Sequence, residues 1–276
     1  MVRIVSDTST LYSTVQAREA GFAVSPLAVT IAGEGYRELD EMTAERFVEI
    51  IAKGHMPASS QPAIGEVMDL YQEYAGEEII NIAMADGLSG TYQSAVAAAE
   101  GAENITVVNT TTLCGPHRYM VEKAVELAKA GKSRQEILDA LDRMMATDVS
   151  YLMPADFDYL RRGGRLSPLV SLVGKTIKLA PVLTQSEDGR QLVMSGVKRS
   201  YKQALAHVTS ELAEHGVYPG WRIYITHAAN DERLAQAKEA MEAAFPGVAI
   251  ECYTLTPACI TQGGPDCVVI QVVKEI

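Results

Sequence analysis

A short loop rich in glycine and hydroxyl residues is the part of the sequence best suited to binding chemistry. It covers residues 85–91 (ADGLSGT). The apolar run 78–84 before it is predicted to form a buried strand, and the alanine-rich run 92–100 after it a helix. The first N–H groups of a helix have no partner within the helix, and the helix dipole is positive at this end. The loop therefore suits an anion, with Ser89 and Thr91 as hydroxyl donors.

A purely structural role is the alternative for this loop, because Ser89 or Thr91 can simply cap the helix. A second stretch, residues 58–63 (ASSQPA), favours the anion site. Its Ser59 and Ser60 come just before a predicted helix at 64–74. Loops at the carboxyl ends of strands converge on one crevice in open α/β sheets. The two stretches are therefore expected to hold one anion from two sides, and the capping alternative stays open.

The order of the predicted elements indicates an α/β protein with two α/β domains. The chain has 276 residues, of which 47% are hydrophobic, enough for two cores. Strands alternate with helices in residues 1–150, which predicts a mainly parallel sheet with helices on both faces. In this part, the threonines at 110–112 are expected to open a helix that reaches Lys129. Residues 151–276 contain a predicted hairpin turn at 187–189, which indicates a mixed sheet.

Composition excludes several classes of protein. The net charge of −11 argues against a general nucleic-acid binder. No apolar run reaches the roughly 18 residues of a membrane span, and no signal peptide precedes the first strand, so a cytoplasmic protein is expected. The four cysteines lack metal-type spacing and are expected to be reduced thiols. The five histidines form no cluster, so neither a metal nor a cofactor is predicted.

The positive charge is concentrated in one segment. Residues 161–202 hold nine of the 24 basic residues and only two acidic ones, which gives +7 for the segment and −18 for the remainder. Its basic residues are Arg161, Arg162, Arg165, Lys175, Lys178, Arg190, Lys198, Arg199 and Lys202. The segment is either an ordinary solvated basic face or a docking surface for an acidic protein or an anionic group.

Motifs for catalysis are absent from the sequence. It contains no phosphate-binding loop of the G-x-x-x-x-G-K-[ST] type and no G-x-S-x-G nucleophile elbow. Ser89 has no histidine near it in sequence. His117 or His227 remains open as the base of a Ser/His hydrolase. The sequence thus predicts no catalytic residue.

Four stretches resemble, in order, the motifs of the DegV family. Residues 59–62 (SSQP) are similar to its T-S-Q-P motif, and residues 87–94 (GLSGTYQS) to its G-L-S-G-T-Y-Q-S signature. Residues 159–167 (YLRRGGRLS) resemble its L-x-R-G-G-R-[IL]-S motif, and residues 178–183 (KLAPVL) its K-x-x-P-[IV]-[LI] strand. The resemblance extends over essentially the whole chain.

This resemblance implies a fatty-acid-binding protein of two α/β domains, residues 1–150 and 151–276, with the acyl chain in a buried tunnel between them. Members of the family serve as the acyl-carrying subunit of a bacterial fatty acid kinase. A separate ATP-binding kinase subunit phosphorylates the carboxylate for phospholipid synthesis. The positions implied in carboxylate binding are Ser59, Ser60, Ser89 and Gly90. The positions implied in docking the kinase are Arg161, Arg162 and Arg165.

Three departures from the family pattern bear on kinase-coupled transfer. Ser59 replaces a threonine and keeps its hydroxyl, whereas Ala85 and Asp86 replace paired serines. Gln262 stands where members carry a histidine near the carboxylate. Its amide can form hydrogen bonds but cannot carry a proton. The alternative function is an enzyme acting on a small carboxylate or phosphate ligand in the same crevice.

Overall fold

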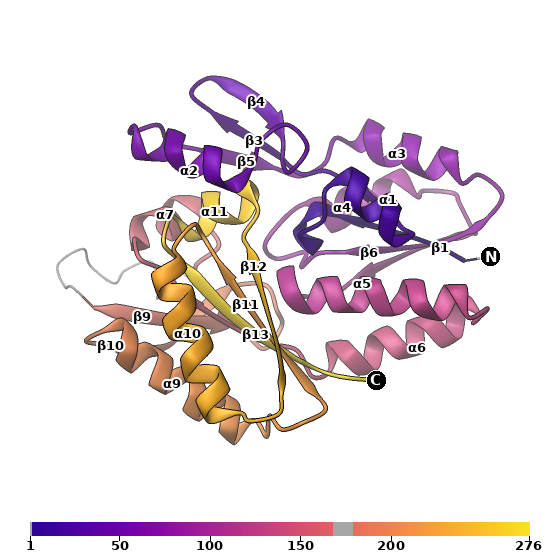
Figure 1. Cartoon of the computed structure of the whole chain (residues 1–276). Coiled ribbons are helices and arrows are strands. Elements are labelled where there is room, and N and C mark those ends of the chain that lie inside the picture. Colours follow the sequence, from indigo (N-terminus) through magenta and orange to yellow (C-terminus); the bar gives the residue numbers. More distant parts are fainter. Residues whose placement is uncertain (1, 168–178) are drawn as a thin grey trace. The chain divides into compact units, whose positions relative to one another are not determined.

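The computed structural model describes residues 2–167 and 179–276 and divides the chain into two compact units (Figure 1). The first unit comprises Met1–Ala146, Thr256–Ala258 and Ile276, and the second Thr147–Leu255 and Cys259–Glu275. Residues 256–258, expected in the second domain, are therefore grouped with the first unit. The expected binding roles of the two domains stay predictions.

A four-stranded parallel sheet forms the centre of the first unit, in the order β2-β1-β6-β7. Its strands are β1 (Val2–Asp7), β2 (Ala23–Ser25), β6 (Glu78–Ala83) and β7 (Ile105–Asn109). β1 lies inside the sheet, between β2 and β6. The predicted parallel sheet is confirmed, and its carboxyl ends carry the loop at 85–91.

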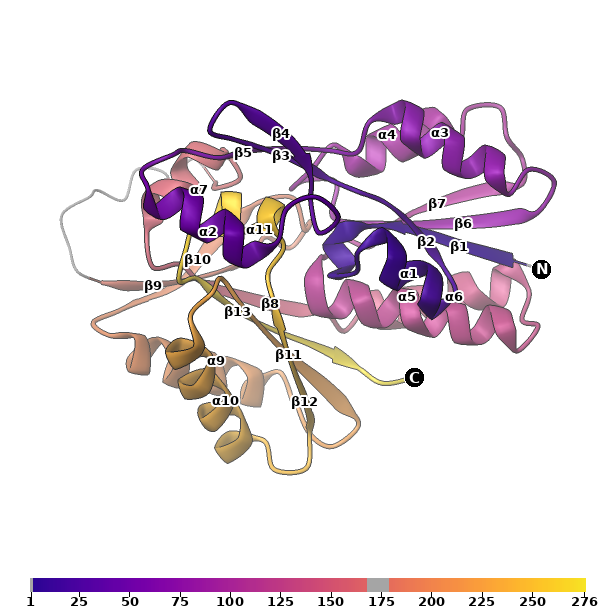
Figure 2. The same ribbon diagram turned by 45° about the horizontal axis from the view of Figure 1, so that its top comes forward.

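Helices cover both faces of this sheet (Figure 2). Helices α3 and α4 pack on one face, where Val67 and Leu70 meet Val5 and Ile79. Helix α5 packs on β1 from the other face, with α6 against α5. The helices, with the 3-10 turn η1, are η1 (Thr8–Thr10), α1 (Thr14–Ala20), α3 (Ile64–Glu73), α4 (Thr91–Ala98), α5 (Cys114–Lys129) and α6 (Arg134–Met145). The threonines at 110–112 precede α5 without opening it, since Thr111 and Cys114 have positive φ angles of 54° and 55°.

A small antiparallel sheet, in the order β4-β3-β5, was not predicted. It consists of β3 (Ala28–Ile31), β4 (Glu34–Arg37) and β5 (Ala58–Ser60), and the helix α2 (Ala44–Ala52) lies in the chain between β4 and β5. The expectation that Ser59 and Ser60 lie in a loop at the end of a parallel strand is wrong. Both residues pair with β3, opposite Val29 and Ala28. This pairing with a distant strand makes β5, because serine has little intrinsic preference for strands.

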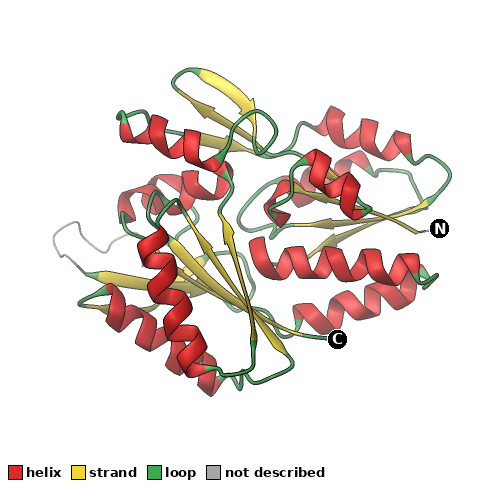
Figure 3. Cartoon of the chain, viewed as in Figure 1, coloured by secondary structure: helices red, strands yellow, loops and turns green. Residues whose placement is uncertain are grey.

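The second unit contains a mixed six-stranded sheet, in the order β10-β9-β8-β13-β11-β12. Figure 3 draws the strands of the chain in yellow and its helices in red. Among the described strands of this sheet, β11 and β12 pair in parallel and the other neighbours pair antiparallel. The strands are β8 (Val149–Met153), β9 (Ala180–Gln185), β10 (Leu192–Lys198), β11 (Trp221–His227), β12 (Ala249–Thr254) and β13 (Val268–Lys274). The predicted mixed sheet and the β9–β10 hairpin are confirmed. Lys175, Lys178 and the start of the fourth motif lie outside the described residues.

Side chains alternate between two cores in this second sheet. On β8, Tyr151 and Met153 belong to the core formed with α9 and α10, whereas Leu152 packs with Leu160 of α7. The period of two follows from the pleat of the strand. The helices are α7 (Phe157–Gly163), α9 (Tyr201–Glu214), α10 (Asp231–Ala244) and α11 (Pro257–Gly263). None of the described helices is long and apolar enough to cross a membrane.

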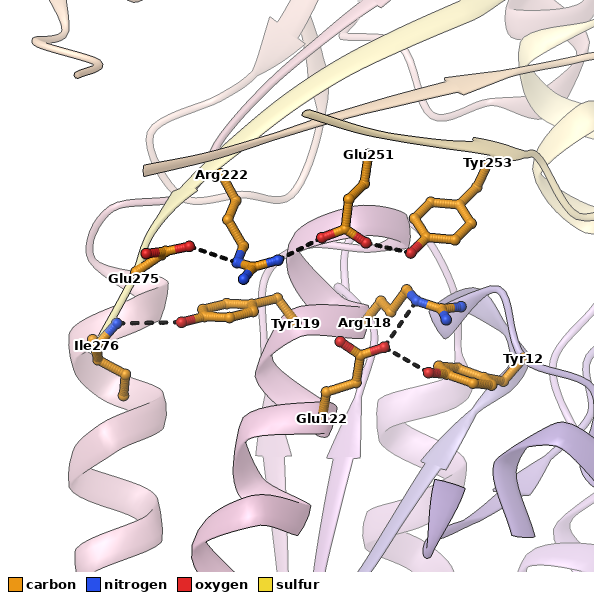
Figure 4. A network of polar contacts seen from close by, with 9 residues as sticks. All are labelled: Tyr12, Arg118, Tyr119, Glu122, Arg222, Glu251, Tyr253, Glu275 and Ile276. Carbon is orange, nitrogen blue, oxygen red and sulfur yellow. Dashed lines mark hydrogen bonds and ion pairs between the residues drawn. The ribbon is translucent and has the colours of Figure 1, made fainter. Parts of the chain in front are cut away.

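Ion pairs and tyrosines link elements within each unit (Figure 4). In the first unit, Glu122 accepts the Tyr12 hydroxyl at 2.6 Å and pairs with Arg118 at 3.0 Å. In the second unit, Arg222 of β11 pairs with Glu251 of β12 at 2.6 Å and with Glu275 at 2.8 Å. Each network joins elements that are separate in sequence.

Candidate functional site

Main-chain hydrogen bonds fix the start of the loop that follows β6. Met84 donates its N–H to the Asp7 carboxylate at 2.9 Å, and Ala85 donates its N–H to the Thr112 carbonyl at 2.9 Å. The Ser89 N–H then returns to the Ala85 carbonyl at 3.2 Å. The loop is therefore a tight turn tied to β1 and to the connection before α5. It delivers Ser89 to the N-terminus of α4.

The Ser89 hydroxyl is paired with the hydroxyl of Thr91 in the first turn of α4. The two oxygens are 2.8 Å apart, and Ser89 Oγ also accepts the Thr91 N–H at 3.3 Å. A hydroxyl has one donor hydrogen and two acceptor lone pairs. When Thr91 donates both its hydroxyl hydrogen and its main-chain N–H to Ser89 Oγ, the Ser89 O–H remains to donate to a ligand. Capping and anion binding by Ser89 are therefore compatible.

Gly90 makes a close approach to the loop after β5. It is the N-cap of α4 with a φ of −74° and forms no side-chain cap. A Cβ atom at Gly90 would collide with the Gln61 side-chain oxygen. The Gln61 amide donates a hydrogen bond to the Ser94 hydroxyl of α4. Gln61 thus brings the S-S-Q-P and G-L-S-G motifs together.

The two serines of the S-S-Q-P motif differ in exposure. Ser59 is half-buried and Ser60 is exposed, both on β5. Successive side chains of a strand point to opposite faces. The two hydroxyls therefore do not share a face, and the half-buried Ser59 is the better placed of the two for a ligand inside the protein.

His117 is a fully buried residue of α5 with hydroxyl partners other than Ser89. Its Nδ1 lies 2.8 Å from Ser9 Oγ, and its Nε2 lies 3.0 Å from the Ile82 carbonyl and 3.1 Å from Ser6 Oγ. A carbonyl only accepts, so Nε2 carries the hydrogen and Nδ1 accepts from Ser9. Burial lowers the pKa of His117 and keeps it neutral.

The hydrolase alternative receives no support from these partners. Among the described residues, Ser89 bonds to Thr91 and not to a histidine. The other candidate base, His227, accepts the Asn230 N–H on its Nδ1 at 3.1 Å. Within the described ranges, no group of three or more histidine, cysteine, aspartate or glutamate side chains is arranged to hold a metal ion.

In the second unit, Gln262 on α11 packs against the arginine-glycine motif. Gln262 is half-buried, and a Cβ atom at Gly163 would collide with its side-chain oxygen. Two residues further along, a Cβ atom at Gly264 would lie 2.9 Å from the Tyr159 ring. The run at 262–265 and the motif at 159–167 therefore form one packed feature, which the sequence analysis did not predict.

The three arginines of this motif are held at the end of α7. Arg161 is exposed and pairs with Asp158 at 3.4 Å. Arg162 is also exposed, and its Nε donates to the Asp158 carbonyl at 3.0 Å. Arg165 is half-buried and donates to the Gly163 carbonyl. Arg161 and Arg162 are thus more accessible to a partner than Arg165.

A family model described as "Uncharacterised protein, DegV family" matches residues 1–275. This chain belongs to the DegV family. Its curated relatives include Protein DegV of Bacillus subtilis, 33% identical over 256 residues that cover 90% of each chain. A DegV domain-containing protein of Staphylococcus aureus is 29% identical and covers 99% of this chain and 98% of its own.

Solved DegV structures share the fold. The crystal structure of DegV, a fatty acid binding protein from Bacillus subtilis, matches with a TM-score of 0.87 and 29% identity, and covers 99% of both chains. A DegV family protein from Thermus thermophilus, described by its fatty acid binding, matches with a TM-score of 0.89 at 24% identity over 99% of both chains. The predicted family and fold class are confirmed.

Sequence reasoning gave Gln61 no role of its own, and it did not predict that Gln262, itself a predicted binding residue, packs against Gly163. Gln61 lies inside the S-S-Q-P motif, so the motif match itself was the available signal. The contact between Gly163 and Gln262 had no such signal, because the two residues are far apart in sequence and meet only in the folded unit.

Proposed function

We propose that this chain binds a long-chain fatty acid and holds the carboxylate with its loop hydroxyls. Ser89 donates its O–H, the N-terminus of α4 contributes its dipole, and Gly90 permits the close approach of Gln61. Ser59 adds a hydroxyl from β5, whereas Ser60, predicted to bind beside it, is exposed on the opposite face of the strand and is left out of the proposed site. Gln262 contributes its amide as a hydrogen-bond donor from α11. The tunnel for the acyl chain stays a prediction of the family resemblance.

The observation that carries this proposal is the Ser89–Thr91 hydroxyl pair at the start of α4. When Thr91 is the donor in this pair, the Ser89 O–H is available to a ligand beside a helix N-terminus, where a negative charge is stabilised. The fatty acid binding of the Bacillus subtilis relative, which shares 29% of its residues and the fold, supports a carboxylate with a long apolar chain as the anion.

We further propose that the bound acid is presented to an ATP-binding kinase subunit, as an acyl carrier for phospholipid synthesis in the bacterial cytoplasm. The exposed Arg161 and Arg162, together with Arg165, are the proposed docking residues. The family resemblance supports the partner. The four cysteines, none of which forms a disulfide, support the compartment. The carrier itself has no proposed catalytic residue.

Native mass spectrometry of the protein purified from cells tests lipid binding. We expect about one acyl chain per monomer, since each buried methylene contributes roughly 0.8 kcal/mol. Ser89→Ala should weaken retention, because a hydrogen bond to a charged group is worth about 1.5–3 kcal/mol. A small carboxylate or phosphate in place of the acyl chain would favour the enzyme alternative.

Ser133→Ala is the matched control for a capping role. Ser133 caps α6 in a complete capping box far along the chain from the loop at 85–91. Both substitutions should lower stability by about 1 kcal/mol if they only remove a cap. Only Ser89→Ala should also release lipid. Equal lipid retention in the Ser89→Ala, Ser59→Ala and Ser133→Ala proteins would contradict the assignment.

A further inference from the structure

Glu38 is a fully buried acid that the proposed function does not use. It directly follows β4, its side chain is 0% exposed, and its N–H donates to the Leu27 carbonyl at 2.9 Å. The next residue, Leu39, has a φ of 65°, in the left-handed region that residues other than glycine rarely adopt. The chain therefore turns sharply just after Glu38, which fixes the position from which its side chain extends.

Three donors converge on the Glu38 carboxylate. The Thr8 hydroxyl donates to Oε1 at 2.5 Å, and the Ala258 N–H donates to Oε2 at 2.8 Å. The hydroxyl of Thr256 forms a further side-chain hydrogen bond with the same group. Thr8 Oγ1 in turn accepts the Leu27 N–H at 3.0 Å, which directs the Thr8 hydrogen toward Glu38.

Two of these donors lie at the start of α11. The helix begins with Pro257, a residue that lacks an N–H and favours the first helical position. The Ala258 N–H is thus the first donor of the helix, and it has no acceptor within the helix. Glu38 supplies that acceptor from 220 positions earlier in the sequence. A negative group is also favourable at this positive end of the dipole.

The position of Glu38 is costly for an acid. Its burial raises the pKa to about 7, and the neighbouring negative charge of Asp7 acts in the same direction. A buried charge is tolerated only when hydrogen bonds compensate for the lost water. An apolar side chain at this place would avoid the cost but could not accept the three hydrogen bonds. The hydrogen bonds that Glu38 accepts at the start of α11 therefore explain why an acid occupies this buried position.

We propose that Glu38 is a positioning residue that fixes the first turn of α11 and, through the helix, the orientation of Gln262. Gln262 lies four residues after Ala258, which places both on the same face of α11 one turn apart. This inference rests on the proposed function insofar as Gln262 contacts the carboxylate. The attachment of α11 to Glu38 is independent of any ligand.

Amide hydrogen exchange of the full chain tests the attachment. Glu38→Gln keeps the shape of the side chain, but its NH₂ group cannot accept a hydrogen bond. We expect exchange at Ala258 to become about tenfold faster or more, because a charge-assisted bond is roughly twice as strong as a neutral one. The amide of Val121, in the core of α5, should keep its rate and serves as the reference for global unfolding.

Glu77→Gln is the matched control, since Glu77 is an acid of the same unit that accepts a hydrogen bond from Arg3 Nε at 2.8 Å, in a separate network. It should leave Ala258 exchange unchanged relative to Val121. Thr8→Val should reproduce part of the Glu38→Gln effect, and Thr8→Ser, which keeps the hydroxyl, should restore slow exchange. Equal acceleration at Ala258 and Val121 in Glu38→Gln would overturn the proposal.

Lipid release tests the step from α11 to Gln262. With the acyl chain found in the purified protein, Glu38→Gln should release it about fivefold faster than wild type. Fast Ala258 exchange with wild-type release would refute the link to Gln262. If the wild-type protein holds no acyl chain, the proposed function fails, and the exchange experiment still decides whether Glu38 holds α11.

Discussion

Buried polar residues of the first unit divide into those that hold strands and those that hold helices. Asp7 accepts N–H groups at the carboxyl ends of β1 and β6, and His117 ties α5 to β6 through the Ile82 carbonyl. Glu38 instead reaches the start of α11. Burial raises the pKa of Glu38 and lowers the pKa of His117, so pH affects these two attachments in opposite directions.

Glu38 should make stability fall as pH rises. Its pKa is about 7 in the folded protein, against an ordinary value of 4.5, so the folded state binds the proton more tightly. The contribution of Glu38 to stability is fully present below pH 4.5 and is lost as pH rises to about 7. The loss is roughly 3 kcal/mol at most. Urea unfolding of wild type and Glu38→Gln at pH 5 and pH 8 measures this difference.

Between pH 5 and pH 8, the free energy of unfolding of Glu38→Gln should increase relative to that of wild type. His117, whose pKa is lowered by burial, has the opposite sign, because its stability is lost as pH falls. It is present in both proteins, so its contribution cancels in the comparison. Unfolding free energies of the two proteins that run parallel with pH would show that Glu38 does not titrate in this range.

Gln262→His should give lipid affinity a pH dependence that wild type lacks. A neutral amide donates at any pH, whereas an imidazole gains charge as pH falls. The bound carboxylate raises the pKa of the histidine, so binding should be tighter at about pH 5.5 than at 7.5, on either side of the reference pKa of about 6.5. A lipid-exchange titration on both proteins checks this. Identical profiles would place Gln262 away from the carboxylate.

At the scale of elements, close approach of α4 to the β5–α3 connection depends on Gly90. Its φ of −74° suits any residue, so only space requires glycine here. Gly90→Ala should displace Gln61, break its bond to Ser94 and cost about 1–3 kcal/mol, a typical penalty for overpacking. Thermal unfolding measures the loss, and lipid retention should fall with it.

Gly65→Ala provides the control for the loss of a glycine. Gly65 lies in α3, and a Cβ atom there would meet nothing within 4 Å. Alanine is a better helix former than glycine, so this variant should be neutral or slightly more stable. Equal behaviour of the two variants would mean that Gln61 adapts to a Cβ atom at position 90 without loss.

At the scale of the whole molecule, the charge is unevenly distributed. The chain carries −11, yet residues 161–202 sum to +7. Opposite charge on a partner speeds association and orients it, and salt screens the effect. Arg165 is turned toward its own motif, so the exposed Arg161 is the sharper probe of docking.

Arg161→Glu should weaken binding to a kinase subunit while leaving bound lipid in place. Reversing one exposed charge should lower the association rate several-fold at low salt, with a smaller effect at high salt. Lys238→Glu on α10 is the control, an exposed cation of the same unit outside the segment. Surface plasmon resonance at two salt concentrations measures both. Equal effects of the two reversals would exclude a localised docking face.

The sequence by itself determined the elements whose signals are local. Runs such as 78–84 and 105–109 are apolar strands flanked by helices of the right length, so a parallel sheet followed from pattern alone. The turn at 187–189 likewise joins β9 and β10 as predicted. The place of Ser89 and Gly90 just before a helix could be predicted because strand, loop and helix are contiguous in sequence there.

Only the tertiary structure decided the features built from distant residues. Ser59 lies on a strand because β3 offers it hydrogen bonds, and Gln61 meets Gly90 across 29 positions. Glu38 finds Ala258 at the far end of the chain. Periodicity and propensity describe each residue with its sequence neighbours, whereas these contacts arise from the folding of separate segments into one unit. Their partners therefore become known only when the fold is known.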